Sequence, residues 1–305
     1  MTKKIVATDF KMRKEDLMRD YAIITDSGCD LSQEMVEKLD IGVAPMGFTI
    51  AQKAYRHFHD FREMSKKKFY ELIRGGEIGK TNGANIQDIV DTMVGKLKQG
   101  LDVLFLSFSS GMSCSYQNAC IAARQAQEEY PDARIEVVDT LTGSVGLGLL
   151  TYLAAKRKAA GEKMDEVIQW VEEHKLNICH FFVVDDLNFI QRSGRTSHLA
   201  AFVGTILGVK PIFKLDNNGK VDSQAKVRGK KMAVKHMLEQ AHKKCTDIKT
   251  FFICHGDTDV EAEDLKKKVE EEFPGAEVVV NCVGPMLGIN VGPGALALIF
   301  YGSER

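Results

Sequence analysis

The stretch from Leu101 to Tyr130 reads LDVLFLSFSSGMSCSYQNACIAARQAQEEY and decides the fold. Its first part, Leu101–Leu106, is an apolar run of the length typical of a buried strand. The next seven residues, 107–113, are mostly Ser and Gly, as in a turn, and Cys114–Tyr130 has the composition of a helix. The sequence therefore predicts a strand, a hydroxyl-rich loop and a helix in direct succession.

A second hydroxyl-rich loop occurs near the start of the chain. The apolar run from Tyr21 breaks at residues 25–30, TDSGCD, before the amphipathic stretch Leu31–Leu39. Hydroxyls and free backbone N–H groups at a helix N-terminus can receive an anion, whether phosphate or carboxylate. Either loop alone could simply cap its helix. Two such loops in one half of the chain favour a binding site.

The order of the elements predicts how the first half is organised. After the helix that ends at Tyr130, residues 133–140 read as a strand and Gly143–Ala160 as a helix with a basic C-terminal turn. Strand and helix in alternation indicate parallel strands with crossover connections. We expect an N-terminal α/β domain over residues 21–162 with a parallel, doubly wound sheet, whose ligands bind beyond the strand C-termini. Residues 1–20 are interpreted as an N-terminal extension.

The second half, residues 163–305, predicts another α/β domain, with a mixed sheet. Asn218-Gly219 lies between two strand-like runs and marks an antiparallel hairpin. Pro211 places the first of these strands at an edge, or the proline near the strand's start. Residues 191–197 are expected to form a polar loop. The remaining expected helices are 164–174, 230–244 and 260–273, and the remaining strands are 178–184, 250–255, 277–283 and 295–301.

Composition excludes several classes of protein. A chain of 305 residues with 44% hydrophobic content favours two domains. The net charge of −1 argues against nucleic acid as a partner. Seven cysteines without a C-x-x-C pair indicate reduced thiols and a cytoplasmic protein. The longest apolar runs are far shorter than the roughly 20 residues that span a bilayer, and the N-terminus lacks the apolar segment of a secretory signal.

Several short motifs together resemble one known family, the DegV family. No single motif is specific, but seven occur in the order expected of that family, and the resemblance covers residues 21–303. The motifs are Thr25-Asp26-Ser27, Lys80-Thr81-Asn82, Ser109–Ala119, Ser193-Gly194-Arg195, Gly208–Pro211, Lys226–Lys231 and Gly292–Leu296.

The resemblance implies a bacterial fatty-acid-binding carrier that is not itself an enzyme and has no cofactor. In that family a long-chain fatty acid lies in a buried tunnel between two domains and is presented to a separate, ATP-dependent fatty acid kinase. Carried over to this chain, the carboxylate contacts would be Thr81 and Ser110, with Ser109 and Ser113 close by. The kinase-facing arginines would be Arg195 and Arg228.

The chain departs from the family pattern at two positions of the expected head-group site. Asn82 stands where the family has Ser, and Asn290 where it has His. An amide can donate a hydrogen bond to a carboxylate but carries no positive charge. Both residues are expected to contribute to ligand binding, and Asn290 predicts an affinity that does not depend on pH near neutrality.

An alternative of another class is a small-molecule hydrolase or transferase that uses Ser110 or Ser113 as its nucleophile. Such an enzyme needs a His or Lys within hydrogen-bond reach of the serine, and the G-x-S-x-G elbow of many hydrolases is missing here. His57 and His59 are separated by one residue, and the sequence places no third metal ligand near them, so no metal site is predicted.

Overall fold

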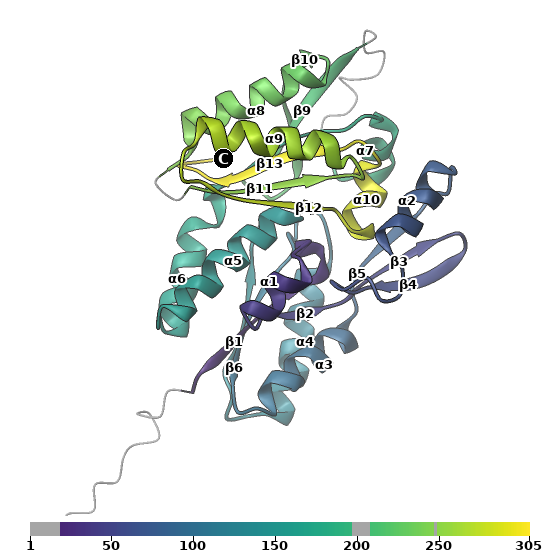
Figure 1. Cartoon of the computed structure of the whole chain (residues 1–305). Coiled ribbons are helices and arrows are strands. Elements are labelled where there is room, and N and C mark those ends of the chain that lie inside the picture. The colour runs from purple at the N-terminus through teal and green to yellow at the C-terminus, as the bar shows by residue number, and fades with distance from the viewer. Residues whose placement is uncertain (1–18, 197–207, 247–248) are drawn as a thin grey trace, which may run out of the picture.

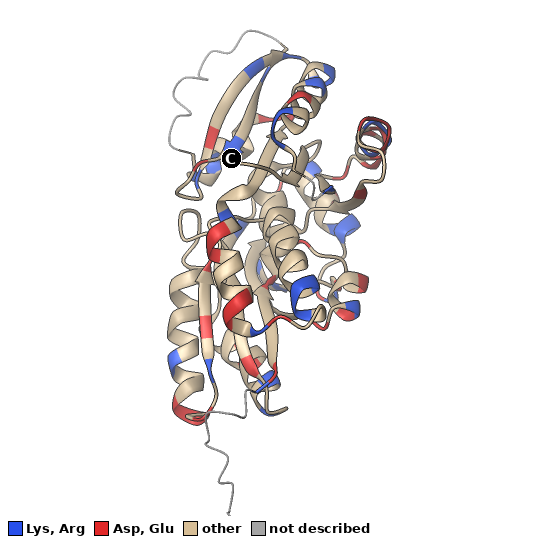
Figure 2. Ribbon diagram, turned by 90° about the vertical axis from the view of Figure 1, so that its left-hand side faces the viewer, with Lys and Arg blue, Asp and Glu red and all other residues tan. Residues whose placement is uncertain are grey.

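The computed structural model describes residues 19–196, 208–246 and 249–305 (Figure 1). Most of the predicted N-terminal extension therefore lies outside the described residues. Within the described ranges, no helix is both long enough and apolar enough to cross a membrane. Acidic and basic residues are interspersed along the ribbons in Figure 2.

The first sheet has four parallel strands in the order β2-β1-β6-β7. All six residues of β1 and five of the six in β6 are buried, which explains why these central strands read as continuous apolar runs. Helices lie on both faces, so the predicted parallel, doubly wound sheet is confirmed. The strands are β1 Tyr21–Asp26, β2 Gly42–Ala44, β6 Asp102–Ser107 and β7 Ile135–Asp139.

A separate three-stranded antiparallel sheet, ordered β4-β3-β5, follows β2 and was not predicted. The alternating burial of β3 is an ordinary strand pattern, whereas β4 and β5 are polar and largely exposed. Their strand character comes from pairing with β3 rather than from their own composition. The strands are β3 Met46–Ile50, β4 Lys53–His57 and β5 Lys80–Ala84.

The C-terminal sheet has six strands in the order β10-β9-β8-β13-β11-β12, and only β11 and β12 pair in parallel. The predicted mixed sheet and its hairpin are confirmed, and Pro211 lies near the start of β9. The strands are β8 Ile178–Val183, β9 Val209–Leu215, β10 Val221–Arg228, β11 Thr250–His255, β12 Glu277–Cys282 and β13 Leu296–Tyr301.

The prediction of a polar loop at 191–197 was partly wrong, because residues 191–193 end helix α7. Asp186 caps the start of this helix through Asn188, and Gly194 ends it in a left-handed conformation. Helices α2, α3 and α10 were also missed. The helices are α1 Gln33–Lys38, α2 Lys66–Arg74, α3 Ile86–Leu97, α4 Ser115–Glu129, α5 Val145–Ala159, α6 Met164–His174, α7 Leu187–Ser193, α8 Lys230–Lys244, α9 Asp259–Glu272 and α10 Pro285–Val291, with 3-10 turns at Ser27–Cys29 and Lys175–Asn177.

Helix α5 lies between the two large sheets. It contacts β1 and β6 on one side and β8, β11 and β13 on the other, while α8 and α9 cover the far face of the C-terminal sheet (Figure 1). Ten of its residues are buried, which explains its weak amphipathic pattern. The two halves thus share one core around α5, and the domain boundary at 162/163 stays an interpretation.

Candidate functional site

A cavity lies where the three sheets meet. It is enclosed by the hydroxyl-rich loop after β6, the loop before α5, strands β5, β8, β11 and β13, and helices α7 and α10. The space free of protein atoms, including the open solvent at its mouth, measures about 1070 Å³. Most of its wall is apolar. Typical lining residues are Met46, Phe108, Phe182, Val283, Met286 and Ile299.

Thr81 and Asn82 lie on β5 at one end of this cavity, next to Ser113. Two contacts fix β5 against the start of α4: the amide of Ala84 donates to Ser115 Oγ at 3.1 Å, and Asn118 Nδ2 donates to the carbonyl of Ala84 at 2.8 Å. The hydroxyls of Ser113 and Ser115 are 2.9 Å apart. The Thr81 hydroxyl has no hydrogen-bond partner among the residues that the structure describes.

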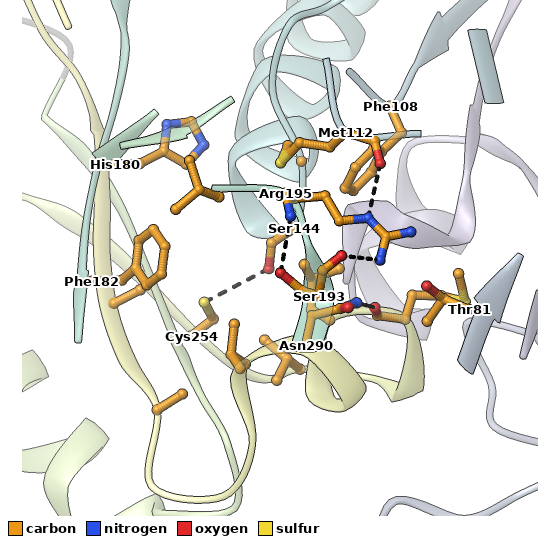
Figure 3. Close-up of a pocket in the computed structure, with 18 of the residues that line it drawn as sticks. Thr81, Phe108, Met112, Ser144, His180, Phe182, Ser193, Arg195, Cys254 and Asn290 are labelled. Atoms are coloured by element: carbon orange, nitrogen blue, oxygen red, sulfur yellow. Dashed lines mark hydrogen bonds between the residues drawn. The ribbon is translucent and has the colours of Figure 1, made fainter. Parts of the chain in front are cut away.

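Arg195 reaches the same end of the cavity from the turn after α7 (Figure 3). Its guanidinium donates to the carbonyl of Met112 at 3.3 Å and to that of Ser193 at 2.6 Å. Thr81 and Arg195 also line two neighbouring open clefts, one beside α4 and one beside α2. The polar end of the cavity is therefore its open end. A guanidinium has five N–H donors, so some remain for a ligand.

Asn290 lines the cavity from α10, but its amide is turned back towards its own helix. Nδ2 donates to the carbonyl of Met286 at 2.7 Å. One N–H and the Oδ1 atom stay available. Asn290 also lines the cleft beside α2, together with Thr81 and Arg195, so the structure brings these three predicted residues together.

Two of the predicted serines lie outside the cavity lining. Ser109 is fully buried, and its hydroxyl donates to the carbonyl of Gly219 at 2.9 Å while accepting the amide of Gly111 at 3.1 Å. This side chain joins the β6 loop to the β9–β10 turn. Ser110 lines only the open cleft beside α4. Arg228 ends β10 on the exposed surface and does not line the cavity.

Two histidines line the cavity without having been predicted there. His180 has Nε2 2.7 Å from the Thr142 hydroxyl and Nδ1 3.0 Å from the carbonyl of Ile178. Burial lowers the pKa of His180 to about 3. Burial also lowers the pKa of His255, whose Nδ1 accepts the amide of Thr258 at 3.0 Å. Both imidazoles are therefore neutral at pH 7.

Among the described residues, no His or Lys is hydrogen-bonded to the side chain of Ser110 or Ser113. Within the described ranges, the hydrogen-bond partners of the Ser113 side chain are the hydroxyl and amide of Ser115, with no His or Lys among them. No group of three or more His, Cys, Asp or Glu side chains in these ranges is arranged to hold a metal. An apolar cavity with hydroxyls and an arginine at its open end suits a ligand with an anionic head and an apolar tail.

Comparisons with known proteins agree with this architecture. The chain is 35% identical to a DegV domain-containing protein of Clostridium perfringens over 290 residues, 94% of this chain and 99% of that protein. The structure superposes on a DegV family protein from Thermus thermophilus, described as fatty-acid binding, with a TM-score of 0.83 and 26% identity over 93% of this chain and 100% of that one.

A similar match is found with DegV of Bacillus subtilis, described as a fatty acid binding protein. Here the TM-score is 0.78 and the identity 26%, over 92% of this chain and 99% of that one. The sequence profile of the DegV family matches residues 20–303. The chain therefore belongs to the DegV family.

Proposed function

We propose that this protein binds one long-chain fatty acid, with its tail in the cavity and its carboxylate at the open end. The observation that carries the proposal is the polarity of the cavity. Its wall is mostly apolar, whereas the hydrogen-bond donors of Thr81, Ser113 and Arg195 lie at the end where the cavity opens into the two clefts. The fatty-acid-binding DegV proteins of Thermus and Bacillus, each 26% identical to this chain, support the same ligand class.

The tail would supply most of the binding energy. Burying each methylene contributes about 0.8 kcal/mol, so a chain of sixteen or eighteen carbons offers far more than the head group. Hydrogen bonds from Thr81 and Ser113 and the charge of Arg195 would fix the orientation of the carboxylate. Asn82 and Asn290 are secondary contacts in this arrangement.

The first experiment identifies what copurifies with the protein and then measures fatty acid affinity after delipidation. We expect a fatty acid by mass spectrometry. Thr81→Ala and Ser113→Ala should each weaken binding by about 0.5–3 kcal/mol, and Arg195→Ala by at least as much, because each removes a hydrogen bond to a charged group. Ser303→Ala is the matched control and should retain affinity, since Ser303 is exposed near the C-terminus and does not line the cavity. Delipidated protein that binds no fatty acid would refute the proposal.

The second part of the proposal is that the bound carboxylate is presented to a separate fatty acid kinase in the cytoplasm. Two features support it: the head-group end opens into two clefts, and Arg228 is exposed on the edge strand β10 beside Lys231. A basic surface of this kind can pair with an acidic surface of a partner. Since Arg195 also lines the cavity, we assign the partner contact chiefly to Arg228.

Phosphorylation of the bound acid by the cognate kinase tests this assignment. Arg228→Glu should reduce the rate at least tenfold while fatty acid affinity is unchanged, because charge reversal repels an acidic partner surface. Lys98→Glu makes the same charge change at the end of α3, on the exposed surface of the N-terminal half, and should leave the rate unaltered. Equal rates in all three proteins would exclude Arg228 from the partner surface.

A further inference from the structure

Phe108 lies at the start of the hydroxyl-rich loop after β6 and lines the cavity with its ring. Its side chain is 6% exposed, and its amide donates to the buried carboxylate of Asp26 at 2.8 Å. One edge of the ring, from Cδ2 to Cζ, lies against two glycines from different parts of the chain. Gly28 belongs to the loop after β1, and Gly143 to the loop before α5.

Neither glycine leaves room for a side chain beside this ring. A Cβ atom at Gly143 would lie 2.5 Å from both Cε2 and Cζ of Phe108, and one at Gly28 would lie 2.7 Å from Cδ2. Real Cβ atoms essentially never approach another heavy atom closer than 3.0 Å. Neither residue has a positive φ, so the backbone itself does not require glycine at either place. The Phe108 ring excludes a side chain at Gly143, and at Gly28 it does so together with Asp26, whose Oδ1 would lie 2.9 Å from the Cβ atom.

Phe108 and Gly143 both line the cavity. Gly28 and Gly143 meet the same edge of the ring, and the backbone amide of Phe108 is fixed through Asp26. A methyl group at Gly143 therefore narrows the space that an acyl chain would use, either directly or by displacing the Phe108 ring. A methyl group at Gly28 acts on two walls, because its Cβ would also lie 3.0 Å from the sulfur of Met46, another lining residue.

We propose that Phe108 is a specificity-determining residue that sets the width of the cavity, and that Gly28 and Gly143 hold its ring in the recessed position. The inference rests on the proposed fatty acid function and adds a ligand preference to it. A straight saturated chain needs less width than a chain bent by a cis double bond. The recessed ring thus admits bent chains of the same length as straight ones.

The test is the ratio of affinities for oleic and stearic acid, which have equal length and the same head group. In Gly143→Ala and Gly28→Ala, binding of oleic acid should weaken at least tenfold relative to stearic acid. Adding Phe108→Leu to Gly143→Ala should restore the ratio, because the smaller side chain tolerates the methyl group. Gly95→Ala is the matched control: it lies on α3 with no neighbour within 4 Å of its Cβ position and should change neither affinity.

A general loss of packing would weaken the binding of both acids equally, and Phe108→Leu would not reverse it. A constant ratio of affinities across these variants therefore overturns the proposal. If Gly143→Ala does not fold, the single variant Phe108→Leu is the test. Its wider cavity should raise the affinity for oleic acid relative to stearic acid above the wild-type ratio. An unchanged ratio refutes the proposal. Wild-type protein that binds neither acid would instead refute the fatty acid function itself.

Discussion

The charge that a ligand meets in the cavity depends on the protonation states of a few lining side chains. Arg195 supplies a guanidinium, the serine and threonine hydroxyls do not titrate, and the two lining histidines are neutral because burial lowers the pKa of each. A fatty acid head group therefore meets the same positive charge throughout the neutral range. Asn290 adds no titrating group.

We therefore expect fatty acid affinity to change less than about twofold between about pH 6.5 and 8, where an ordinary histidine would titrate. A short, soluble acid measured by calorimetry avoids the effect of pH on micelles. Asn290→His serves as the positive control and should bind more tightly at the acidic end. A steep dependence in the unmodified protein would contradict this and would implicate Asp26, which holds Phe108 and whose pKa burial raises to about 7.

Sequence and structure differ most at individual side chains. The hydroxyl-rich loop was predicted as a site, but which serine faces the cavity depends on the turn geometry: Ser113 faces it, Ser109 bonds to Gly219 and Ser110 faces a cleft. His180 was visible in the sequence as a histidine within an apolar strand. Nothing local placed it against the cavity, because its neighbours there come from distant segments.

At the scale of elements, the strong periodic signals were predicted within one or two residues. Helices α6 and α8 and strand β11 begin and end where expected, since each carries an unbroken pattern with clear ends. Between residues 40 and 100 no element was predicted, so β2, β3 and the amphipathic helices α2 and α3 were missed although their patterns were readable. The other misses are short or polar elements stabilised by tertiary contacts. β4 and β5 depend on β3, while α7 and α10 pack on each other. Pairing partners far along the chain cannot be read from local periodicity.

At the scale of the whole molecule, the two halves meet around α5, and Asp30 joins them directly. Its carboxylate accepts the amide of Gly284 at 2.8 Å and the Ser144 hydroxyl at 2.9 Å, and its carbonyl accepts Asn281 Nδ2 at 3.1 Å. Asp30 has a left-handed conformation, with φ of 50°. Ser144 in turn lines the cavity, so the residue that joins the halves also supports the wall of the site.

Burial raises the pKa of Asp30 to about 6, although the two donors lower it. The folded protein therefore holds this proton more tightly than the unfolded chain. The stability associated with Asp30 is fully present below the unfolded pKa of about 4 and is lost as the pH rises to about 6. An asparagine at this position would keep an acceptor, tolerate the left-handed conformation and never ionise.

We expect the free energy of unfolding of Asp30→Asn, taken relative to wild type, to be about 2 kcal/mol higher at pH 7.5 than at pH 4.5. This value follows from the difference between the two pKa values. Denaturant unfolding of both proteins at both pH values measures this difference. The contributions of titrating groups present in both proteins, such as His57, largely cancel when the variant is compared with wild type. Asp30→Ala should lose about 1–3 kcal/mol at either pH, because it leaves the buried amide of Gly284 without a partner. If the difference between Asp30→Asn and wild type is the same at both pH values, Asp30 does not contribute to the pH dependence of folding.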